Sequence, residues 1–170
     1  AAERALELDS MDSTVLGFVG CALADIGYPD RALPILRNAV EINPANAQAW
    51  ASLGSACLLT RRVVEAVQHL THGINISPLD SRLSIWGAML ALGLMQSKDL
   101  EGALRQGELA CQRDHRSHIP RVVVAAIHLL RDKPELALQA LNDAYRIKPD
   151  LEPAQVYPLL GRELGGRLMK

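Results

Sequence analysis

The sequence predicts an all-α fold, a superhelical stack of antiparallel helix pairs that ends in a C-terminal capping helix. The apolar pattern recurs at an offset of 34 residues, and a unit of that size buries its apolar face only against copies of itself. Prolines fall at the edges of the expected helices. The 170 residues are 49% hydrophobic but only 4% aromatic, a composition typical of closely packed helices.

Two copies of the pattern align at every position in the first half of the chain. The first copy comprises Leu16, Val19, Gly20, Leu23, Ala32, Leu36, Ala39 and Pro44, and the second comprises Trp50, Leu53, Gly54, Cys57, Ala66, Leu70, Gly73 and Pro78. Large and small residues in this order resemble the tetratricopeptide repeat, a helix–turn–helix unit. The resemblance implies a solenoid that presents a concave surface to a partner.

The first two repeats are expected at residues 13–46 and 47–80. In the first, Gly27 ends one helix and Pro29 opens the next, where a missing N–H costs nothing. In the second, Arg61 and Arg62 stand where the family commonly has Gly-Asp, and we expect them to form a solvated turn.

The third repeat, 81–117, is expected to be lengthened, and the fourth covers 118–151. Ala91 and Ala103 are 12 residues apart, whereas the step from Leu23 to Ala32 is 9 residues. The three extra residues predict either an additional helical turn or a longer loop around 96–98.

Both ends of the chain differ from a full repeat. Residues 1–12 match the last part of a preceding repeat, so we expect the chain to be part of a longer protein. Residues 152–170 have helical spacing and prolines that could open a helix, and they predict a cap over the fourth repeat. Gly165 and Gly166 should fray that helix, since each glycine costs about 1 kcal/mol relative to alanine.

Charge and cysteine usage exclude several classes of function. The net charge is −1, which gives no electrostatic footprint for nucleic acid or an anionic membrane. No apolar run approaches the roughly 20 residues of a membrane span. The three cysteines have no paired spacing, so we expect no disulfide framework, no metal, no cofactor and a cytoplasmic setting.

The family resemblance implies that the first helix of each pair lines a partner-binding groove. The slots of that groove are strongly apolar towards the C-terminal half, and an apolar patch usually marks a partner. An amphipathic helix or an extended protein segment would fit it; a terminal segment, a neighbouring domain or a second copy could cover it instead. The residues carried over are Gln48, Ser55, Leu58, Leu59, Arg82, Ile85, Met89, Leu92, Val122, Leu129 and Leu130.

One activity of the family is not implied. Members that clamp the C-terminal carboxylate of chaperones use Lys and Asn on their first helices, supported by Lys and Arg on the third. Here Gly17, Cys21 and Gln48 occupy the early positions, and only Arg82 fits. A carboxylate clamp needs converging donors, so chaperone tails are not the expected ligands.

No constellation of residues predicts catalysis. His69 and His72 have the i, i+3 spacing that places both rings on one helical face, but no third metal ligand is evident. Cys57 falls in a core position and should be a small buried hydrophobe. Phosphate loops and nucleophile elbows are also lacking, so we expect no enzyme.

The predicted function is a non-catalytic scaffold for protein–protein interaction. An alternative is a regulatory segment of a bacterial signalling protein that acts by intrachain contact or dimerisation. The segment 76–80, the lengthened third repeat and the partial last repeat are similar to the C-terminal repeat regions of class III adenylate cyclases and winged-helix regulators. A homodimer that buries the apolar slots is the third possibility.

Overall fold

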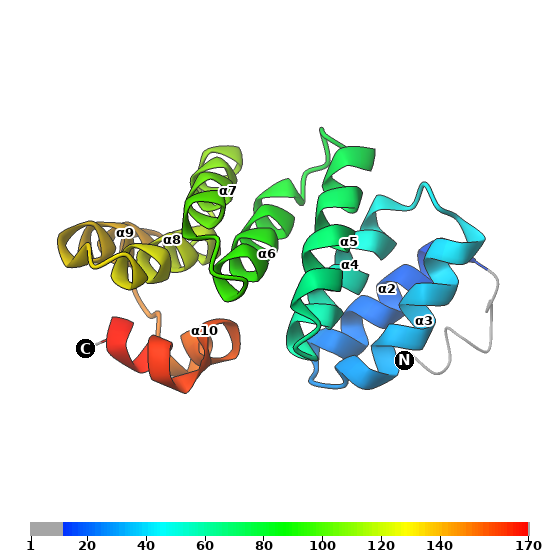
Figure 1. Cartoon of the computed structure of the whole chain (residues 1–170), viewed down its shortest axis with the longest axis horizontal. Coiled ribbons are helices and arrows are strands. Elements are labelled where there is room, and N and C mark those ends of the chain that lie inside the picture. Colours follow the sequence, from blue (N-terminus) through cyan, green and yellow to red (C-terminus); the bar gives the residue numbers. More distant parts are fainter. Residues whose placement is uncertain (1–11, 170) are drawn as a thin grey trace. The chain divides into compact units, whose positions relative to one another are not determined.

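The computed structural model describes residues 12–169, and this part of the chain is all-α (Figure 1). It forms two compact units that divide after Asp80, and each is described by itself. Unit 1 contains the helices α2 (Ser13–Asp25), α3 (Pro29–Ile42), α4 (Ala47–Leu59) and α5 (Val63–Ile76). Unit 2 contains α6 (Leu83–Gln96), α7 (Leu100–Arg113), α8 (Ile119–Leu130), α9 (Pro134–Ile147) and α10 (Pro153–Leu168). The predicted fold class is confirmed; the partial repeat expected at 1–12 lies, except for residue 12, outside the described residues.

Unit 1 consists of two helix pairs, α2 with α3 and α4 with α5, and α4 packs on both helices of the first pair. Small residues set the spacing within each pair. A Cβ atom added at Gly54 would lie 2.6 Å from Cγ and 2.9 Å from the backbone N of Leu70, so the two helices touch backbone to side chain. Leu36, Leu53 and Leu70 fill the resulting core and are almost completely buried.

Polar groups tie the first pair to the second. The Ser13 hydroxyl donates to the Ala39 carbonyl at 2.9 Å, and the Asn46 side-chain amide donates to the Ser13 carbonyl at 3.0 Å. The Asn46 side chain also accepts from the backbone N–H of Ala49 at 3.0 Å and so caps α4. Asn46 therefore caps α4 and also links it to α2.

Unit 2 repeats this arrangement, with α6 paired to α7, α8 paired to α9, and α8 packed on both α6 and α7. The Ser84 hydroxyl donates to the Ala110 carbonyl at 2.9 Å, over the same 26 residues that separate Ser13 from Ala39. Ser84 is thus the structural equivalent of Ser13.

This equivalence corrects the predicted register of the third repeat. Leu94, and not Ala91, corresponds to Leu23, and it lies 9 residues before Ala103, as Leu23 lies 9 residues before Ala32. The turn 97–99 has the same length as the turns 26–28, 60–62 and 131–133. The prediction of a longer turn was wrong: the extra residues are in the connection 77–82, which precedes α6.

Each of these four turns places its middle residue in the left-handed region. The φ angles are 90° for Gly27, 63° for Arg61, 68° for Lys98 and 54° for Asp132. In each turn the last N–H donates to a carbonyl five residues earlier, as from Arg62 to Cys57 at 2.8 Å, which closes the helix with a Schellman-type cap. Arg61 and Arg62 are exposed, as predicted for a solvated turn.

Two prolines and a pair of glycines lie inside helices, although the sequence pattern predicts them at helix ends. Pro34 is inside α3, where its exposed position confines the lost backbone hydrogen bond to the solvent side. Pro158 is inside α10, which is interrupted at Gly161 by backbone angles of φ 77° and ψ 163°. The helix continues through Gly165 and Gly166, so α10 breaks at Gly161 and not at the glycine pair.

No helix in the described residues is both long enough and apolar enough to cross a membrane. The apolar residues of these helices are divided among faces that pack on neighbouring helices.

A buried histidine makes unit 2 sensitive to acid. His128, in the last turn of α8, is only 9% exposed, and its Nδ1 atom has no hydrogen-bond partner among the described residues. Burial lowers the pKa of His128 below its usual 6.5, and the charge of Arg131 lowers this pKa further. Protonation therefore favours the unfolded chain, where the pKa is unshifted.

We expect the free energy of unfolding to fall as the pH drops below about 6.5, and this dependence to be weaker in His128→Leu. The stabilisation from neutral His128 is complete above the unfolded pKa and is lost as the pH falls towards the lower folded pKa. Urea denaturation at pH 7.5 and 5.5 measures the difference. Part of the slope should persist, because burial also lowers the pKa values of His69 and His118; an identical slope in the variant would exclude the role of His128.

Candidate functional site

The candidate binding surface in unit 1 is the side of α2 and α4 that points away from their partner helices. On α2, Leu16, Val19 and Leu23 are buried, and Gly20 packs on Leu36 of α3. With 3.6 residues per turn, the opposite side of each helix remains accessible. It carries Thr14, Phe18, Cys21 and Asp25 on α2 and Gln48, Ser55 and Leu59 on α4, which we call the α2–α4 face.

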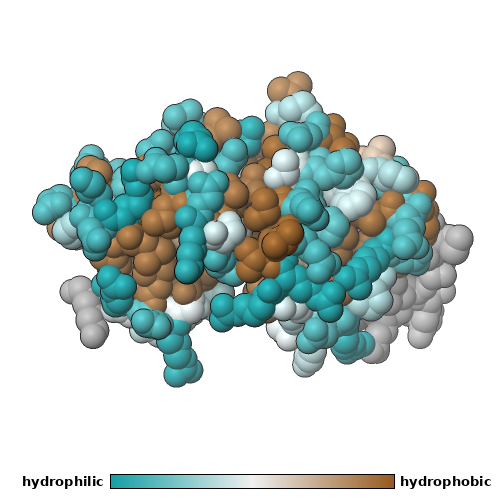
Figure 2. All heavy atoms as spheres, viewed as in Figure 1, coloured by the Kyte–Doolittle hydropathy of each residue, from teal (hydrophilic) through white to brown (hydrophobic). Residues whose placement is uncertain are grey.

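Two large apolar side chains stand on the α2–α4 face. Phe18 is 55% exposed and Leu59 is 49% exposed, and α2 and α4 are in direct contact. Figure 2 shows that exposed apolar atoms of this protein lie among hydrophilic ones. Phe18 was missed by the sequence interpretation, although it is the single phenylalanine and lies one turn from both Thr14 and Cys21.

The polar members of the α2–α4 face are already organised. The Gln48 side-chain amide donates to the Ser52 hydroxyl at 2.8 Å, and the Ser55 hydroxyl donates to the Ala51 carbonyl at 3.0 Å. The Cys21 thiol lies 3.7 Å from the Asp25 carboxylate. These contacts fix the side chains around the two apolar residues and leave the carboxylate of Asp25 at an exposed edge.

Three of the groove residues expected from the resemblance are core residues. Leu58 is 7%, Leu92 is 3% and Val122 is 0% exposed, so none of them can line an open groove in this structure. At the equivalent position of Val122 in the first repeat, a side chain on Gly17 would contact Ala49 at 3.4 Å. This slot faces the next helix pair, and packing within the stack fills it.

The corrected register also moves the expected slots on α6. Arg82 precedes the helix as its N-cap residue, with its guanidinium 4.9 Å from the centre of the Trp86 ring. Ile85 is 37% exposed and becomes the equivalent of Thr14, while Met89 is half-buried and becomes the equivalent of Phe18. The other expected slots, Leu129 and Leu130, are half-buried at the end of α8.

In unit 2, the corresponding face of α8 is covered by the chain itself. Val123 occupies the position that Phe18 has on α2, yet it is 0% exposed. Helix α10 packs against α8 and buries its own Val156 and Leu168, and the Tyr145 hydroxyl on α9 lies 3.9 Å from the Met169 sulfur. The C-terminal helix is thus one of the elements that pack on α8.

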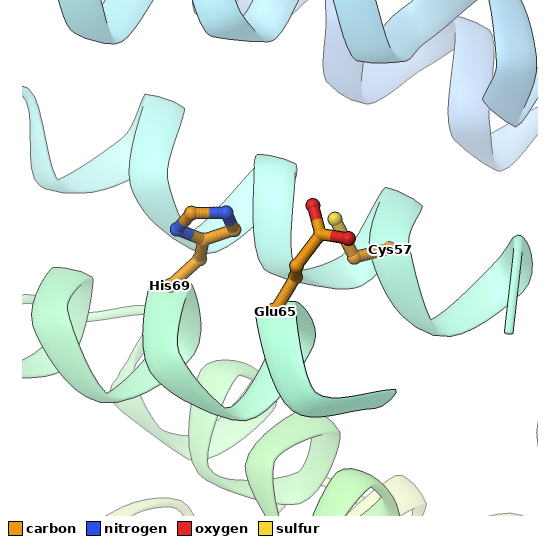
Figure 3. A group of neighbouring side chains, drawn as sticks. All are labelled: Cys57, Glu65 and His69. Carbon is orange, nitrogen blue, oxygen red and sulfur yellow. The ribbon is translucent and has the colours of Figure 1, made fainter. Parts of the chain in front are cut away.

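The two histidines singled out by their spacing both lie against Trp50, and His69 has two further neighbours. His72 stacks edge-on against Trp50 at 4.6 Å between ring centres, and the His69 ring lies 5.3 Å from the same indole. Figure 3 shows His69 beside Glu65 of α5 and Cys57 of α4, and one donor atom from each of these three residues lies within 4.8 Å of the others. His69 therefore has potential co-ligands, which the sequence interpretation did not identify, and they do not include His72.

The electrostatics of this cluster reflect burial and two cations. Burial and, to a lesser extent, the Glu65 carboxylate raise the pKa of the Cys57 thiol to about 11. Burial lowers the pKa of His69. Glu65 itself pairs with Arg37 at 3.4 Å and with Arg62 at 3.8 Å. The thiol is therefore protonated and unreactive at neutral pH, as expected for a structural cysteine.

Within each unit one helix pair packs on the next, which is the arrangement of helical repeat proteins. Residues 27–93 match the tetratricopeptide repeat family. This segment is therefore similar to tetratricopeptide repeats, and the turns of the described helix pairs outside it have the same length.

One curated relative matches in sequence. The chain is 30% identical over 128 residues to anaphase-promoting complex subunit 3 of Schizosaccharomyces pombe, an alignment that covers 74% of this chain and 18% of that protein. The chain therefore spans about a fifth of the length of this relative.

Solved structures with the same fold are more distant in sequence. The crystal structure of MamA has a TM-score of 0.71 at 18% identity and covers 88% of this chain and 85% of its own. The Cut9–Hcn1 hetero-tetramer of the APC/C has a TM-score of 0.78 at 14% identity and covers 94% of this chain and 30% of its own. MamA from Desulfovibrio magneticus RS-1 gives 0.69 at 18% identity, over 84% and 78% of the two chains. At these identities the likeness concerns the fold.

Proposed function

We propose that this protein is a non-catalytic scaffold that binds a protein segment on the α2–α4 face. The observation that supports it is the contrast between two equivalent positions. Phe18 is 55% exposed on α2, whereas Val123 is fully buried on α8, against which α10 packs. The packing of α10 on α8 supports a helix as the ligand, and α2 has no such cover among the described residues.

The ligand best suited to the α2–α4 face is an amphipathic helix with two apolar anchors about one or two turns apart. Helix-in-groove recognition uses such i, i+4 and i+7 anchors, and large buried side chains dominate interface energies. Phe18 and Leu59 supply the apolar contacts, and Gln48 and Ser55 border them with polar groups. The relatives named above include a member of the anaphase-promoting complex and the Cut9–Hcn1 hetero-tetramer, which agrees with a role in assembly.

We expect the double variant Phe18→Asp/Leu59→Asp to lose its partner while it keeps its helix content and its midpoint of unfolding. Affinity capture with quantitative mass spectrometry should identify a protein that the wild type retains and the variant does not. The binding loss should reach about a thousandfold, since two exposed hot-spot side chains contribute roughly 2 kcal/mol each and every 1.4 kcal/mol is about tenfold in affinity.

The matched control is Leu138→Asp, because Leu138 is 59% exposed on the second helix of its pair. This variant should capture the partner as well as the wild type. Equal loss in both variants, or retention in both, would argue against the α2–α4 face.

A second candidate is a regulatory segment that works by intrachain contact, and the position of α10 on α8 favours it. In this case α10 is displaced when a partner binds α8. Deleting residues 152–170 should then create a new binding activity that Phe18→Asp/Leu59→Asp does not affect. Light scattering of the same truncated chain tests the homodimer, in which the uncovered face of α8 pairs with a second copy. The narrower likeness to cyclase and winged-helix regulators is tested by whether the native protein also contains a cyclase or winged-helix domain.

A further inference from the structure

A second potential site lies between α4 and α5, and it is distinct from the α2–α4 face. Glu65 and His69 stand four residues apart on α5 and point towards α4, where the Cys57 side chain lies beside the carboxylate (Figure 3). A sulfur, an oxygen and a nitrogen donor come within 4.8 Å of one another. The i, i+4 spacing places the two α5 ligands on one helical face, and the helix pair supplies the third.

We propose that Cys57, Glu65 and His69 bind a zinc ion. Thiolate, imidazole and carboxylate are the three ligand types that Zn²⁺ takes from proteins, at about 2.0–2.3 Å. The ligand atoms around a tetrahedral zinc ion are closer together than the 4.8 Å within which the three donor atoms lie here. Small rotations of the Glu65 and His69 side chains would bring the donor atoms to the tetrahedral positions. Three protein ligands leave one coordination position for water.

The exposure of the three ligands and the ion pairs that compete for Glu65 are both compatible with reversible zinc binding. Cys57 is 0% exposed, so the sulfur forms the floor, while the half-buried His69 and Glu65 form the rim. Glu65 contacts Arg37 at 3.4 Å and Arg62 at 3.8 Å, and all three side chains are about 45% exposed. Exposed ion pairs at such distances are weak, so the carboxylate can exchange them for the metal. The two cations nevertheless oppose a third positive charge, and they limit the affinity.

Binding exchanges one proton for the ion. Zn²⁺ displaces the proton of the Cys57 thiol, which passes to solvent, while the sulfur lone pair forms the metal bond. Because a proton is released on binding, the affinity for zinc should increase as the pH rises.

The experiment is a titration of the purified, reduced chain with Zn²⁺ against a chromophoric chelator, with Co²⁺ as a spectroscopic probe. We expect one ion per chain and a near-ultraviolet thiolate-to-cobalt charge-transfer band. Cys57→Ala should abolish that band. His69→Gln and Glu65→Gln should weaken zinc binding by at least about tenfold, since even outer-shell partners change metal affinity by roughly 10–100-fold. Arg37→Gln should tighten binding because it releases one carboxylate oxygen.

The matched controls are Cys111→Ala, which removes a half-buried cysteine on α7, and His72→Gln, which removes the histidine stacked on Trp50. Both should bind zinc as the wild type does. Circular dichroism without metal establishes that each variant folds, and the two partly exposed ligands on α5 provide the test if Cys57→Ala does not. Absence of stoichiometric binding, a cobalt band that survives in Cys57→Ala, or equal losses in His72→Gln and His69→Gln would overturn the proposal.

Discussion

Val122→Asp should unfold unit 2, although the family resemblance assigns Val122 to the partner-binding groove. The side chain is completely buried, and a carboxylate placed there has neither solvent nor a partner. We expect a loss of at least about 4 kcal/mol in the free energy of unfolding, at the exceptional end for one substitution. Urea denaturation followed by circular dichroism measures it.

Leu59→Asp is the control for this prediction, since Leu59 comes from the same expected groove but is 49% exposed. Its free energy of unfolding should change by less than about 0.5 kcal/mol, as for most surface substitutions. Wild-type stability in Val122→Asp would mean that this residue is on the surface, and it would restore the original expectation for α8.

The second large effect is expected for Gly54→Val. Even a single Cβ atom at this position would lie 2.6 Å from the Leu70 side chain, 2.9 Å from its backbone N and 3.0 Å from the Ala66 carbonyl. Two of these three atoms belong to the backbone, so a rotamer change cannot relieve the clash and α5 must move away from α4. We expect a destabilisation of about 3 kcal/mol or more, at the upper end of overpacked substitutions, seen as a lower thermal midpoint.

Gly166 is a control that separates the effect of helix spacing on stability from the effect of the low helix propensity of glycine. Nothing lies within 4 Å of a Cβ atom built at Gly166 in α10, so Gly166→Ala should be neutral or stabilise the chain by up to about 1 kcal/mol. If Gly54→Val unfolds no more easily than the wild type, the close approach of α4 and α5 is not what holds this pair together.

The repeat period predicted most of the fold because it records packing within each pair. Trp50, Gly54, Ala66 and Leu70 recur at the offsets of the first repeat, and the structure places two helices within each of the first two expected repeats. The third repeat was misaligned because its first helix, LSIWGAMLALGLMQ, is apolar on every side. Without a polar face, a shift of three residues leaves the pattern almost unchanged, and the register becomes evident from the Ser84 hydrogen bond and the turn 97–99.

The surface was less predictable because exposure depends on contacts between distant segments. Leu59 and Phe18 remain open, whereas Val123 is buried in a unit where α10 packs on α8, and no property of Val123 or its neighbours in sequence indicates that cover. The proposed zinc ligands could not be grouped from the sequence for the same reason. Glu65 and His69 are related by helical spacing, but Cys57 comes from the preceding helix, and it joins them only when α4 and α5 pair.

The left-handed turns have a consequence for how this sequence can diverge. Gly27, Arg61, Lys98 and Asp132 share one backbone conformation, and the cap that holds it is made by main-chain groups. A lineage that exchanges these exposed side chains keeps the hairpin angle and loses only a modest amount of stability, since non-glycine residues tolerate this region at a cost of about 1–2 kcal/mol. Turn sequences can therefore drift while the architecture is inherited, and kinship among such arrays is better traced through the small residues between helices than through the loops.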